Sequence, residues 1–580
     1  MKVCLAQINT TPGDFDGNFA SICAGIDAAD ASGADIVLFP ELTIPGYLHQ
    51  DLIYHAAYVE KNLDVLGDVV RRTRGLQRLH VVVGYIDCND GAGKPFRNMA
   101  AVIRDGQIVC LYQKQLLPFY DVFDEARYYE PGDALALFEV DGVLVGVTIC
   151  EDLWNDKGSD DYNYANNPAG RYRRAGAKVL LSLNSSPFVM DKGWQRVRMI
   201  AEVNNADVTV VYVNQRGGQD ELIFDGHSFV MRGQDLLHVS GSVFEDTFDT
   251  VELGAPPLVA DTPLRRAEVR GMGASLFDLL TLCLRDYTTK SGFSELTLAS
   301  SGGVDSAVVC LLAAEAVGAD KVHAIRMPSR FSSAHSRIDA EQLHRNLGCW
   351  DYEVPIDHDP VVRMLASHFE THANQTNLVR RVGADQGSVA NENIQARLRD
   401  LYLMHFSNAY GAMPLSTGNK TESACGYYTH FDMNFSFAPI KDLLKFQVVS
   451  LARGADAVPE SIWQKPPSAE LRPDQTDEDS LLPYAVLDPI VKSYVEDYVA
   501  TLPGMRAWAA AKREAEVTIT SDVERLDTWL ASEAAAAEHD RVVRLMGRME
   551  YKRRQTCPGI KVSRVAFGIG RRIPIVEKWS

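Results

Sequence analysis

The sequence Ser-Gly-Gly-Val-Asp-Ser at residues 301–306 constrains the fold of this chain more than any other segment. It follows an apolar run at residues 296–299, which predicts a buried strand, and precedes residues 307–317, which predict a helix. Glycine lets the backbone come close to an anion, and the free N–H groups at a helix N-terminus attract negative charge. The segment therefore predicts a strand, an anion-binding turn and a helix in a layered α/β domain.

A missing sequence element indicates which part of ATP this turn would bind. The Gly-Lys-Ser/Thr ending of the P-loop, whose lysine reaches the β- and γ-phosphates, is missing from residues 301–306. We therefore expect the turn to bind ATP through its pyrophosphate and to support cleavage between the α- and β-phosphates. The alternative is a plain glycine turn before a buried helix, which the serines and Asp305 disfavour.

The same motif resembles the signature of the ATP pyrophosphatases, which adenylate a carboxylate or carbonyl oxygen. The resemblance implies a doubly wound, Rossmann-like parallel sheet that binds its ligand at the carboxyl ends of the strands. It also implies that the motif supplies five ATP-binding residues, namely Ser301, Gly302, Gly303, Asp305 and Ser306.

The first half of the chain predicts a second layered α/β domain. Short apolar runs typical of buried strands recur there, several of them separated by helix-like segments. These runs lie at residues 3–6, 36–39, 81–83, 143–147, 179–182 and 208–211.

Three reactive side chains follow apolar runs in this half: Glu41, Lys114 and Cys150. A thiol attacks only as thiolate, so a cysteine nucleophile needs a base and gains from a nearby cation. Taken singly, each residue could equally be a core cysteine or half of a surface ion pair. Their order and flanking residues resemble the nitrilase superfamily, which implies an αββα sandwich in which Cys150 is the nucleophile, Glu41 the base and Lys114 the oxyanion stabiliser.

Further segments resemble the glutaminase domain of the glutamine-dependent NAD synthetases. They lie at residues 116–125, 184–188 and 217–222. This resemblance implies that Tyr120, Ser186 and Lys192 bind glutamine.

In the second half, Pro-Leu-Ser-Thr-Gly-Asn-Lys-Thr-Glu at residues 414–422 is another apolar run that enters a glycine turn. A lysine suits a phosphate, and a carboxylate can hold Mg²⁺ through its oxygens. The segment resembles the NAD synthetases, which implies that Thr417 and Lys420 bind ATP. The same resemblance implies that Glu422 holds Mg²⁺ together with Asp305.

Residues 392–399, 464–471, 477–481 and 550–562 match the same family. For any one basic residue among them, a solvated surface patch is the simpler interpretation. The family usually has a glycine shortly after the position of Thr429, where this chain reads His-Phe-Asp at residues 430–432, so we expect a reshaped turn. The resemblance implies Ser468 as a further ATP contact, and Asn393, Arg397, Glu422, Lys465 and Lys552 as contacts of deamido-NAD.

Length and composition agree with a large two-domain enzyme. We expect a glutaminase domain at residues 1–254, a linker at 255–270 and a synthetase domain at 271–580 with an extra alanine-rich helical segment near 505–540. The net charge of −19 argues against nucleic-acid or anionic-membrane partners. Ten scattered cysteines, no signal peptide and no apolar membrane span favour a cytoplasmic location. The family implies a homo-oligomer.

These features together predict ATP-dependent amidation of deamido-NAD to NAD, with ammonia from glutamine, an adenylated intermediate and Mg²⁺ as the metal. One alternative is another ATP-pyrophosphatase amidotransferase, but those use a Cys-His-Glu or N-terminal-cysteine glutaminase, and this chain begins Met1-Lys2. The other is a non-catalytic nucleotide or nitrogen sensor, which the set of reactive residues disfavours.

Overall fold

The structure is a computed structural model that describes residues 1–154, 164–203, 208–258, 272–372, 384–429, 436–473 and 475–575. The chain forms two compact units, a first unit (Met1–Cys283) and a second unit (Leu284–Ser580). The division falls inside helix α7 (Leu276–Lys290), later in the chain than the linker expected at residues 255–270. Most of that expected linker, from residue 259 onward, lies outside the described residues.

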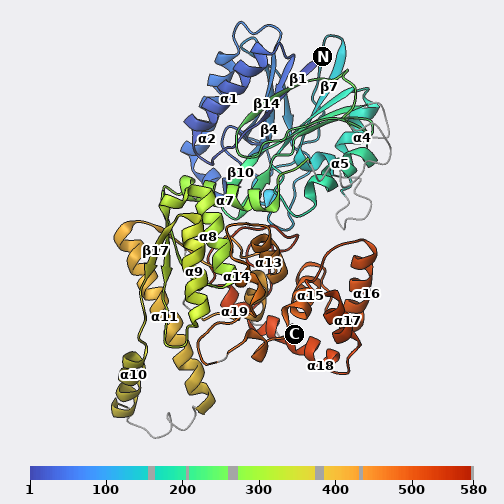
Figure 1. The fold of residues 1–580 in the computed structure, drawn as a ribbon. Coiled ribbons are helices and arrows are strands. Elements are labelled where there is room, and N and C mark those ends of the chain that lie inside the picture. Colours follow the sequence, from blue (N-terminus) through green and yellow to red (C-terminus); the bar gives the residue numbers. More distant parts are fainter. Residues whose placement is uncertain are drawn as a thin grey trace. The chain divides into compact units, whose positions relative to one another are not determined.

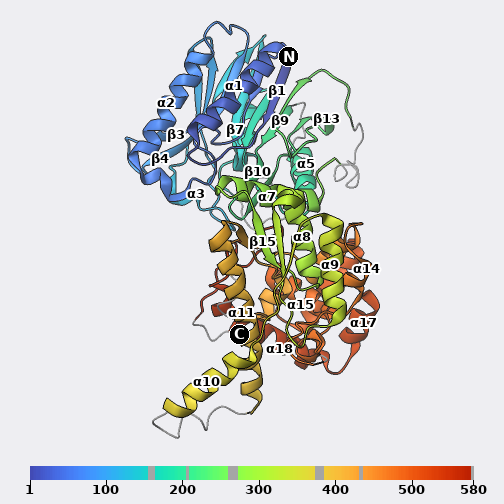
Figure 2. The same cartoon turned by 60° about the vertical axis from the view of Figure 1, so that its left-hand side comes forward.

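The first unit contains two six-stranded mixed sheets (Figures 1 and 2). In order across the first sheet, the strands are β14 (Thr247–Glu252), β1 (Lys2–Gln7), β2 (Ile36–Leu38), β3 (His80–Cys88), β4 (Phe96–Arg104) and β5 (Gln107–Gln113). Those of the second sheet are β13 (Asp235–Val239), β12 (Phe229–Arg232), β9 (Thr209–Asn214), β8 (Val179–Asn184), β7 (Val143–Ile149) and β6 (Leu137–Val140). A separate hairpin pairs β10 (Arg216–Gln219) with β11 (Leu222–Asp225).

Alternation along the strands explains how the two sheets stack. Val3 and Leu5 of β1 face the inner core, which they share with Val145 and Val147 of β7. The intervening residues of β1 face the opposite way, because successive strand side chains point to opposite faces. They pack under helices α1 (Phe15–Ala31) and α2 (Ala56–Arg72). Helices α4 (Pro168–Arg174) and α5 (Lys192–Val203) pack on the second sheet, which completes the expected αββα sandwich.

The second unit is built on a parallel sheet of four strands, β17 (Trp350–Glu353), β16 (Val322–Arg326), β15 (Leu296–Ala299) and β18 (Met413–Leu415), in this spatial order. The chain runs outward from β15 to β17 and returns to the other side of β15 with β18. Such a reversal creates a crevice at the carboxyl ends of β15 and β18, and doubly wound sheets bind ligands at such a crevice. The expected Rossmann-like topology is therefore present.

Helices cover both faces of this sheet (Figure 1). Helix α8 (Val304–Val317) contacts α9 (Ala334–Leu347), α13 (Lys445–Arg453) and α14 (Glu460–Gln464), whereas α11 (Ala384–Tyr410) contacts β15 and β18. The shorter or peripheral helices are α10 (Asp359–His372), α12 (Lys420–Cys425) and α19 (Glu550–Arg553).

The alanine-rich segment near residues 505–540 is helical. It forms α16 (Leu502–Glu514), α17 (Val523–Ala531) and the start of α18 (Ala535–Arg548). These helices share an apolar core with α15 (Tyr484–Glu496), in which Met505, Trp508, Leu526 and Met546 are buried. Within the described parts of the chain, no helix is long and apolar enough to cross a membrane.

Candidate active sites

Cys150 stands at a sharp turn where β7 ends and the short 3₁₀ helix η2 (Cys150–Leu153) begins. Its φ of 44° lies in the left-handed region, which is unfavourable for a residue with a side chain. Strained backbone of this kind persists where the surrounding structure enforces it, and it is frequent at active sites. The turn therefore fixes the thiol, which is 5% exposed, at the carboxyl end of a core strand.

Glu41 and Lys114 meet in the same interior. Glu41 follows β2 and Lys114 follows β5, and Lys114 Nζ donates to Glu41 Oε1 at 2.6 Å and to Glu125 Oε2 at 2.7 Å. Asn98 Nδ2 also donates to Glu41 Oε1, at 2.8 Å. The other oxygen, Oε2, is buried and accepts no hydrogen bond from any described residue. Glu41 thus keeps one carboxylate oxygen available for a proton.

Burial sets the protonation states of this group. It raises the pKa of the Cys150 thiol well above its usual range, Glu41 adds to the rise, and Lys114 opposes it. The resting cysteine is therefore a thiol that needs a base. Burial alone would lower the pKa of Lys114, but Glu125 and Glu41 raise it well above normal, so the lysine stays a cation. Burial also raises the pKa of Glu125 to about 7, against the opposing effect of Lys114.

Asp152 ties the cysteine turn to the segment after β5. Its Oδ2 accepts from Ile149 N at 2.9 Å and from Tyr112 Oη at 2.8 Å. Its Oδ1 accepts from Leu116 N at 2.9 Å and from Gln115 N at 3.1 Å. Because Gln115 adjoins Lys114 and Ile149 adjoins Cys150, this one buried carboxylate fixes the positions of the cation and the nucleophile relative to each other.

The three residues expected to bind glutamine lie around this centre. Tyr120 Oη donates to both carboxylate oxygens of Glu151, the neighbour of Cys150, at 3.0 Å. Lys192 Nζ lies 4.4 Å from the ring centre of Trp154, just after η2. The residue before Ser186, Ser185, donates from Oγ to the backbone oxygen of Glu41 at 3.1 Å.

A buried ion pair holds the backbone of Ser186 in place. Arg196 Nη1 donates to both oxygens of Asp225 at 2.8 Å, and Arg196 Nη2 donates to the backbone oxygen of Ser186 at 2.7 Å. Burial lowers the pKa of Arg196, but Asp225 outweighs this effect, so the guanidinium remains charged. The loop that carries Ser186 is consequently held by charge-assisted hydrogen bonds.

In the second unit, the turn between β15 and α8 has the geometry expected of an anion-binding loop. Gly302 has a φ of +78°, and a Cβ at this position would lie 2.1 Å from the backbone oxygen of Ser336. Only glycine fits here, because any side chain would collide with the first turn of α9. Ser301 Oγ accepts from Gly303 N at 3.2 Å and lies 3.1 Å from Ser306 Oγ, which fixes the turn from within.

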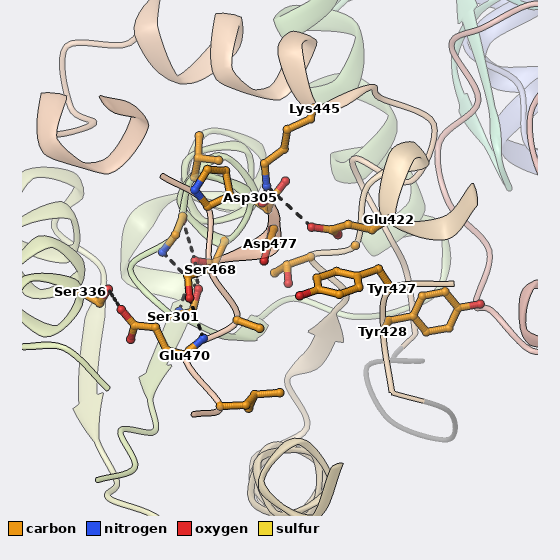
Figure 3. A pocket seen from close by; sticks show the side chains of 18 of the residues that line it. Ser301, Asp305, Ser336, Glu422, Tyr427, Tyr428, Lys445, Ser468, Glu470 and Asp477 are labelled. Atoms are coloured by element: carbon orange, nitrogen blue, oxygen red, sulfur yellow. Dashed lines mark hydrogen bonds and ion pairs between the residues drawn. The ribbon is translucent and has the colours of Figure 1, made fainter. Parts of the chain in front are cut away.

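The second glycine turn, residues 416–419 after β18, lies beside the first. Asn419 Nδ2 donates to Asp305 Oδ1 at 2.8 Å and so joins the two turns across the reversal of strand order. Both turns line a cavity of about 1180 Å³, part of which Figure 3 shows. The sequence-predicted residues that line it are Ser301, Gly303, Asp305, Ser306, Asn393, Thr417, Glu422, Lys465, Ser468 and Lys552.

Asp305 and Glu422 come together in this cavity around Lys445 (Figure 3). Lys445 Nζ pairs with Asp305 Oδ2 and lies 3.7 Å from Glu422 Oε1. Burial raises the pKa of Glu422 to about 8, Asp305 adds to the rise, and Lys445 opposes it. Two neighbouring carboxylates of this kind fit a cation, and Mg²⁺ is often held by one or two carboxylates plus substrate phosphates. Within the described ranges, no set of three or more acidic, histidine or cysteine side chains forms a metal cage.

Two of the predicted contacts lie elsewhere. Lys420 does not line the cavity: its side chain is fully buried and its Nζ contacts Asp442 at 2.9 Å and Glu496 at 2.7 Å. The role expected for it at ATP does not fit this position. Arg397 is exposed and lies outside the cavity lining, which Arg399 of the same helix joins instead. The turn expected to be reshaped at residues 430–432 lies outside the described residues.

Sequence reasoning missed Lys445 and Glu125 as members of the two sites. Neither belongs to a glycine turn or directly follows a strand. Glu125 ends the segment of residues 116–125 that resembles the glutaminase domain, which was the one available signal for it. Lys445 follows an apolar pair at the start of α13 and offers no comparable signal.

Comparison with known proteins identifies the family of both halves of the chain. A protein-family model described as carbon-nitrogen hydrolase matches residues 2–232, and one described as NAD synthase matches residues 276–515. The glutamine-dependent NAD(+) synthetase of Thermotoga maritima is 34% identical over an alignment of 625 positions, which covers 100% of this chain and 99% of that protein. This chain belongs to the glutamine-dependent NAD(+) synthetases.

Solved structures lead to the same family. The glutamine-dependent NAD(+) synthetase of Acinetobacter baumannii, in complex with ADP, is 29% identical with a TM-score of 0.69, over 100% of this chain and 99% of that one. A glutamine-dependent NAD(+) synthetase from Cytophaga hutchinsonii, 19% identical, shares the fold with a TM-score of 0.75 over 100% and 98% of the two chains. The family, the enzyme class and the fold class predicted from the sequence are confirmed.

Proposed function

We propose that the two units carry the two halves of one reaction, the ATP-dependent amidation of deamido-NAD to NAD. The first unit would hydrolyse glutamine to glutamate and ammonia. The second unit would convert ATP to AMP and pyrophosphate while it transfers that ammonia to deamido-NAD. The observation that carries the proposal is the buried contact of Lys114 with Glu41 beside Cys150, a set suited to amide cleavage.

In the first unit, the available oxygen of Glu41 would take the proton of the Cys150 thiol as sulfur attacks the side-chain amide carbon of glutamine. Lys114 would stabilise the oxyanion that forms, because its charge is fixed and shielded from water. Glu41 would pass the thiol proton to the departing nitrogen as the intermediate collapses, which would release ammonia, leave a thioester and restore the carboxylate. Water, activated by the same carboxylate, would then release glutamate. Tyr120, Ser186 and Lys192 would hold the rest of the glutamine molecule.

In the second unit, the nicotinate carboxylate of deamido-NAD would attack the α-phosphorus of ATP and displace pyrophosphate. A free carboxylate is a poor acceptor of ammonia, whereas the adenylated acid has AMP as a good leaving group. The glycine turn at residues 301–303, Ser306, Thr417 and Ser468 would bind ATP. Asn393, Lys465 and Lys552 would contact deamido-NAD, together with Glu422.

Mg²⁺ would be held by Asp305 and Glu422, which already lie around one cation, Lys445. When bound, it would supply charge neutralisation to the phosphates. Lys445 would remain beside the two carboxylates and contribute a second positive charge to the same end of the cavity.

Free ammonia is largely protonated at neutral pH and is then no nucleophile. We therefore propose that ammonia passes between the sites along a protected path, and that an external ammonium scavenger leaves the glutamine-driven reaction intact. Loss of that reaction in the presence of the scavenger would refute this step. We also propose that the enzyme is a cytoplasmic homo-oligomer without nucleic-acid or membrane partners, as its charge and family suggest.

The acceptor is tested by following AMP formation from ATP and Mg²⁺ with ammonium as nitrogen donor. We expect AMP to form with deamido-NAD and to accompany NAD in equal amounts. Formation of AMP with aspartate or a nucleotide carbonyl acceptor, but not with deamido-NAD, would instead favour another amidotransferase of the ATP-pyrophosphatase type.

A further inference from the structure

A loop that borders the cavity of the second unit is fastened to helix α9 through one carboxylate. Glu470 Oε1 accepts from Ser333 Oγ at 2.8 Å and from Ser336 Oγ at 2.7 Å, while Oε2 accepts from Ser333 N at 3.2 Å. Figure 3 shows Glu470 directed at Ser336. The first turn of a helix offers unsatisfied N–H groups and a partial positive charge, so a carboxylate is well placed there.

The start of α9 that Glu470 contacts also packs against the glycine turn at residues 301–303. The backbone oxygen of Ser336 presses against Gly302, where a Cβ would lie only 2.1 Å away. A shift of the start of α9 would therefore move or release that turn. Because the Glu470 carboxylate holds this end of α9, it also holds the backbone oxygen of Ser336 against which Gly302 packs.

The same residue fixes the loop on its other side. Glu470 N donates to Ser468 Oγ at 3.1 Å, and Ser468 Oγ donates to the backbone oxygen of Gln475 at 2.5 Å. Lys465, at the start of the loop, contacts Ser336 Oγ at 3.2 Å and Asp339 Oδ2 at 3.0 Å. The side chains predicted to meet the substrates are therefore aligned by their contacts with the first turns of α9.

The backbone of Glu470 is itself in an unfavourable conformation, with a φ of 48°. A non-glycine residue adopts the left-handed region at a cost, which the surrounding contacts must offset. Here the offsetting contacts are the three hydrogen bonds of the carboxylate. They act together with the contacts of Lys465 and Ser468 that also hold this loop.

We infer that Glu470 is a positioning residue that pins the loop at residues 465–471 to α9 and so aligns Ser468 and Lys465 with the turn at Ser301. This inference rests on the proposed function of the second unit. Glu470 need not touch ATP, because it acts through Ser333 and Ser336. The opposite arrangement is a guard, in which the carboxylate occupies the position of a phosphate and leaves when ATP binds.

The experiment compares Glu470→Ala and Glu470→Gln with Glu460→Gln as the matched control. Glu460 is a carboxylate ten residues earlier that accepts a hydrogen bond from Gln464 within α14, and it does not line the cavity. The dissociation constant of ATP is measured by equilibrium dialysis, and the KM for ATP is measured with deamido-NAD and ammonium. Denaturant titration of each variant, which follows the unfolding of the second unit, reports whether that unit is folded.

For Glu470→Ala we expect both constants for ATP to rise by about tenfold to hundredfold, the range for loss of charge-assisted hydrogen bonds. Glu470→Gln should show a smaller rise, because its amide oxygen can still accept from the two serine hydroxyls, while kcat changes less than KM. Glu460→Gln should match wild type. Unchanged or tighter ATP binding by Glu470→Ala would overturn the inference, and tighter binding would identify a guard.

A second variant keeps the inference testable if Glu470→Ala does not fold. Replacing Ser333 and Ser336 together by alanine removes the two hydroxyl groups that donate to the carboxylate, and should weaken ATP binding to a similar extent. Combined with Glu470→Ala, it should add less than the sum of the two effects, because both changes break one set of contacts. Full additivity would contradict the inference. Since dialysis needs no acceptor, these results remain decisive even if deamido-NAD proves to be the wrong substrate.

Discussion

The first unit seals the charged side chains of its site inside the protein, whereas the second unit spreads them around a cavity of about 1180 Å³. Glu41 and Lys114 have no exposed side-chain surface, and their partners Asn98 and Glu125 are themselves buried in the first unit. Asp305 and Glu422 keep 16% and 19% of their side chains exposed, and their surroundings come from segments more than a hundred residues apart. One site is preassembled, and the other is completed by loops.

This difference decides how each site should respond to change. In a sealed site, each charge is balanced by its neighbours, so removal of one partner leaves another unpaired in a low-dielectric interior. In an open site, water and substrate can replace a lost partner. We therefore expect steep, local effects in the first unit and graded effects on substrate affinity in the second.

The steepest test of this contrast is Glu41→Gln. The amide cannot take the proton of Cys150, so glutamine hydrolysis should fall by about 10²- to 10⁴-fold, the usual contribution of a general base. Steady-state assays with glutamine and with ammonium measure the two halves separately. Ammonium-driven NAD formation should stay near the wild-type rate, and a matching loss there would show that the two sites are not separable.

Lys420→Met tests the buried cation of the second unit that does not line the cavity. Asp442 and Glu496 would lose their partner in the interior, and such losses usually cost about 3–5 kcal/mol. The free energy of unfolding of the second unit, followed by denaturant titration, should drop by this amount while glutamine hydrolysis persists. A normal stability combined with a specific loss of ATP affinity would instead restore the role at ATP that the sequence suggested.

The pH dependence of glutamine hydrolysis tests the balance of charge around Lys114. Burial raises the pKa of Glu125 to about 7, so this carboxyl takes up a proton as the pH falls through that value. Lys114 then loses one of its two anionic partners, and the rate should decline on the acid side with an apparent pKa near 7. Glu125→Gln should lower the rate but remove this limb of the profile. An unchanged limb in the variant would assign it to another group.

The smallest effect is expected at the surface of the alanine-rich helices. Arg513 Nη2 and Asp527 Oδ1 lie 2.6 Å apart, but both side chains are about half exposed. Exposed ion pairs contribute little, so Arg513→Ala should change the free energy of unfolding by no more than about 0.5 kcal/mol. Thermal unfolding of the variant provides the contrast with Lys420→Met. An equal loss of stability in the two variants would mean that burial does not explain the difference between Lys420 and Arg513.

The contrast between the sites also explains which residues the sequence could predict. Cys150, Glu41 and Lys114 each follow an apolar run, which predicted strand ends, and the resemblance of their order to the nitrilase superfamily placed them in one site. The glycine turn at residues 301–303 was predictable because the backbone at Gly302 requires glycine, whereas the turn at residues 416–419 was predicted from its resemblance to the family. The strand and turn pattern predicted layered α/β domains, and the two specific fold classes followed from the family resemblances.

The direction in which a side chain points could not be predicted from the sequence. Arg397 and Arg399 lie two residues apart on α11, and a helix turns through about 200° over that interval, so only one of them can face the cavity. Lys420 begins α12 and points into a buried acidic cluster, although its turn borders the cavity. Lys445 reaches Asp305 from 140 residues away, a contact that only tertiary packing creates.

The most direct test of the two-site account is the nitrogen donor used by Cys150→Ala. NAD formation from deamido-NAD, ATP and Mg²⁺ is measured for wild type and variant, with glutamine or ammonium as donor. We predict that wild type uses both donors and that the variant uses ammonium alone. Glutamine-driven NAD formation by the variant at the wild-type rate would contradict the account, because the nucleophile would then lie elsewhere.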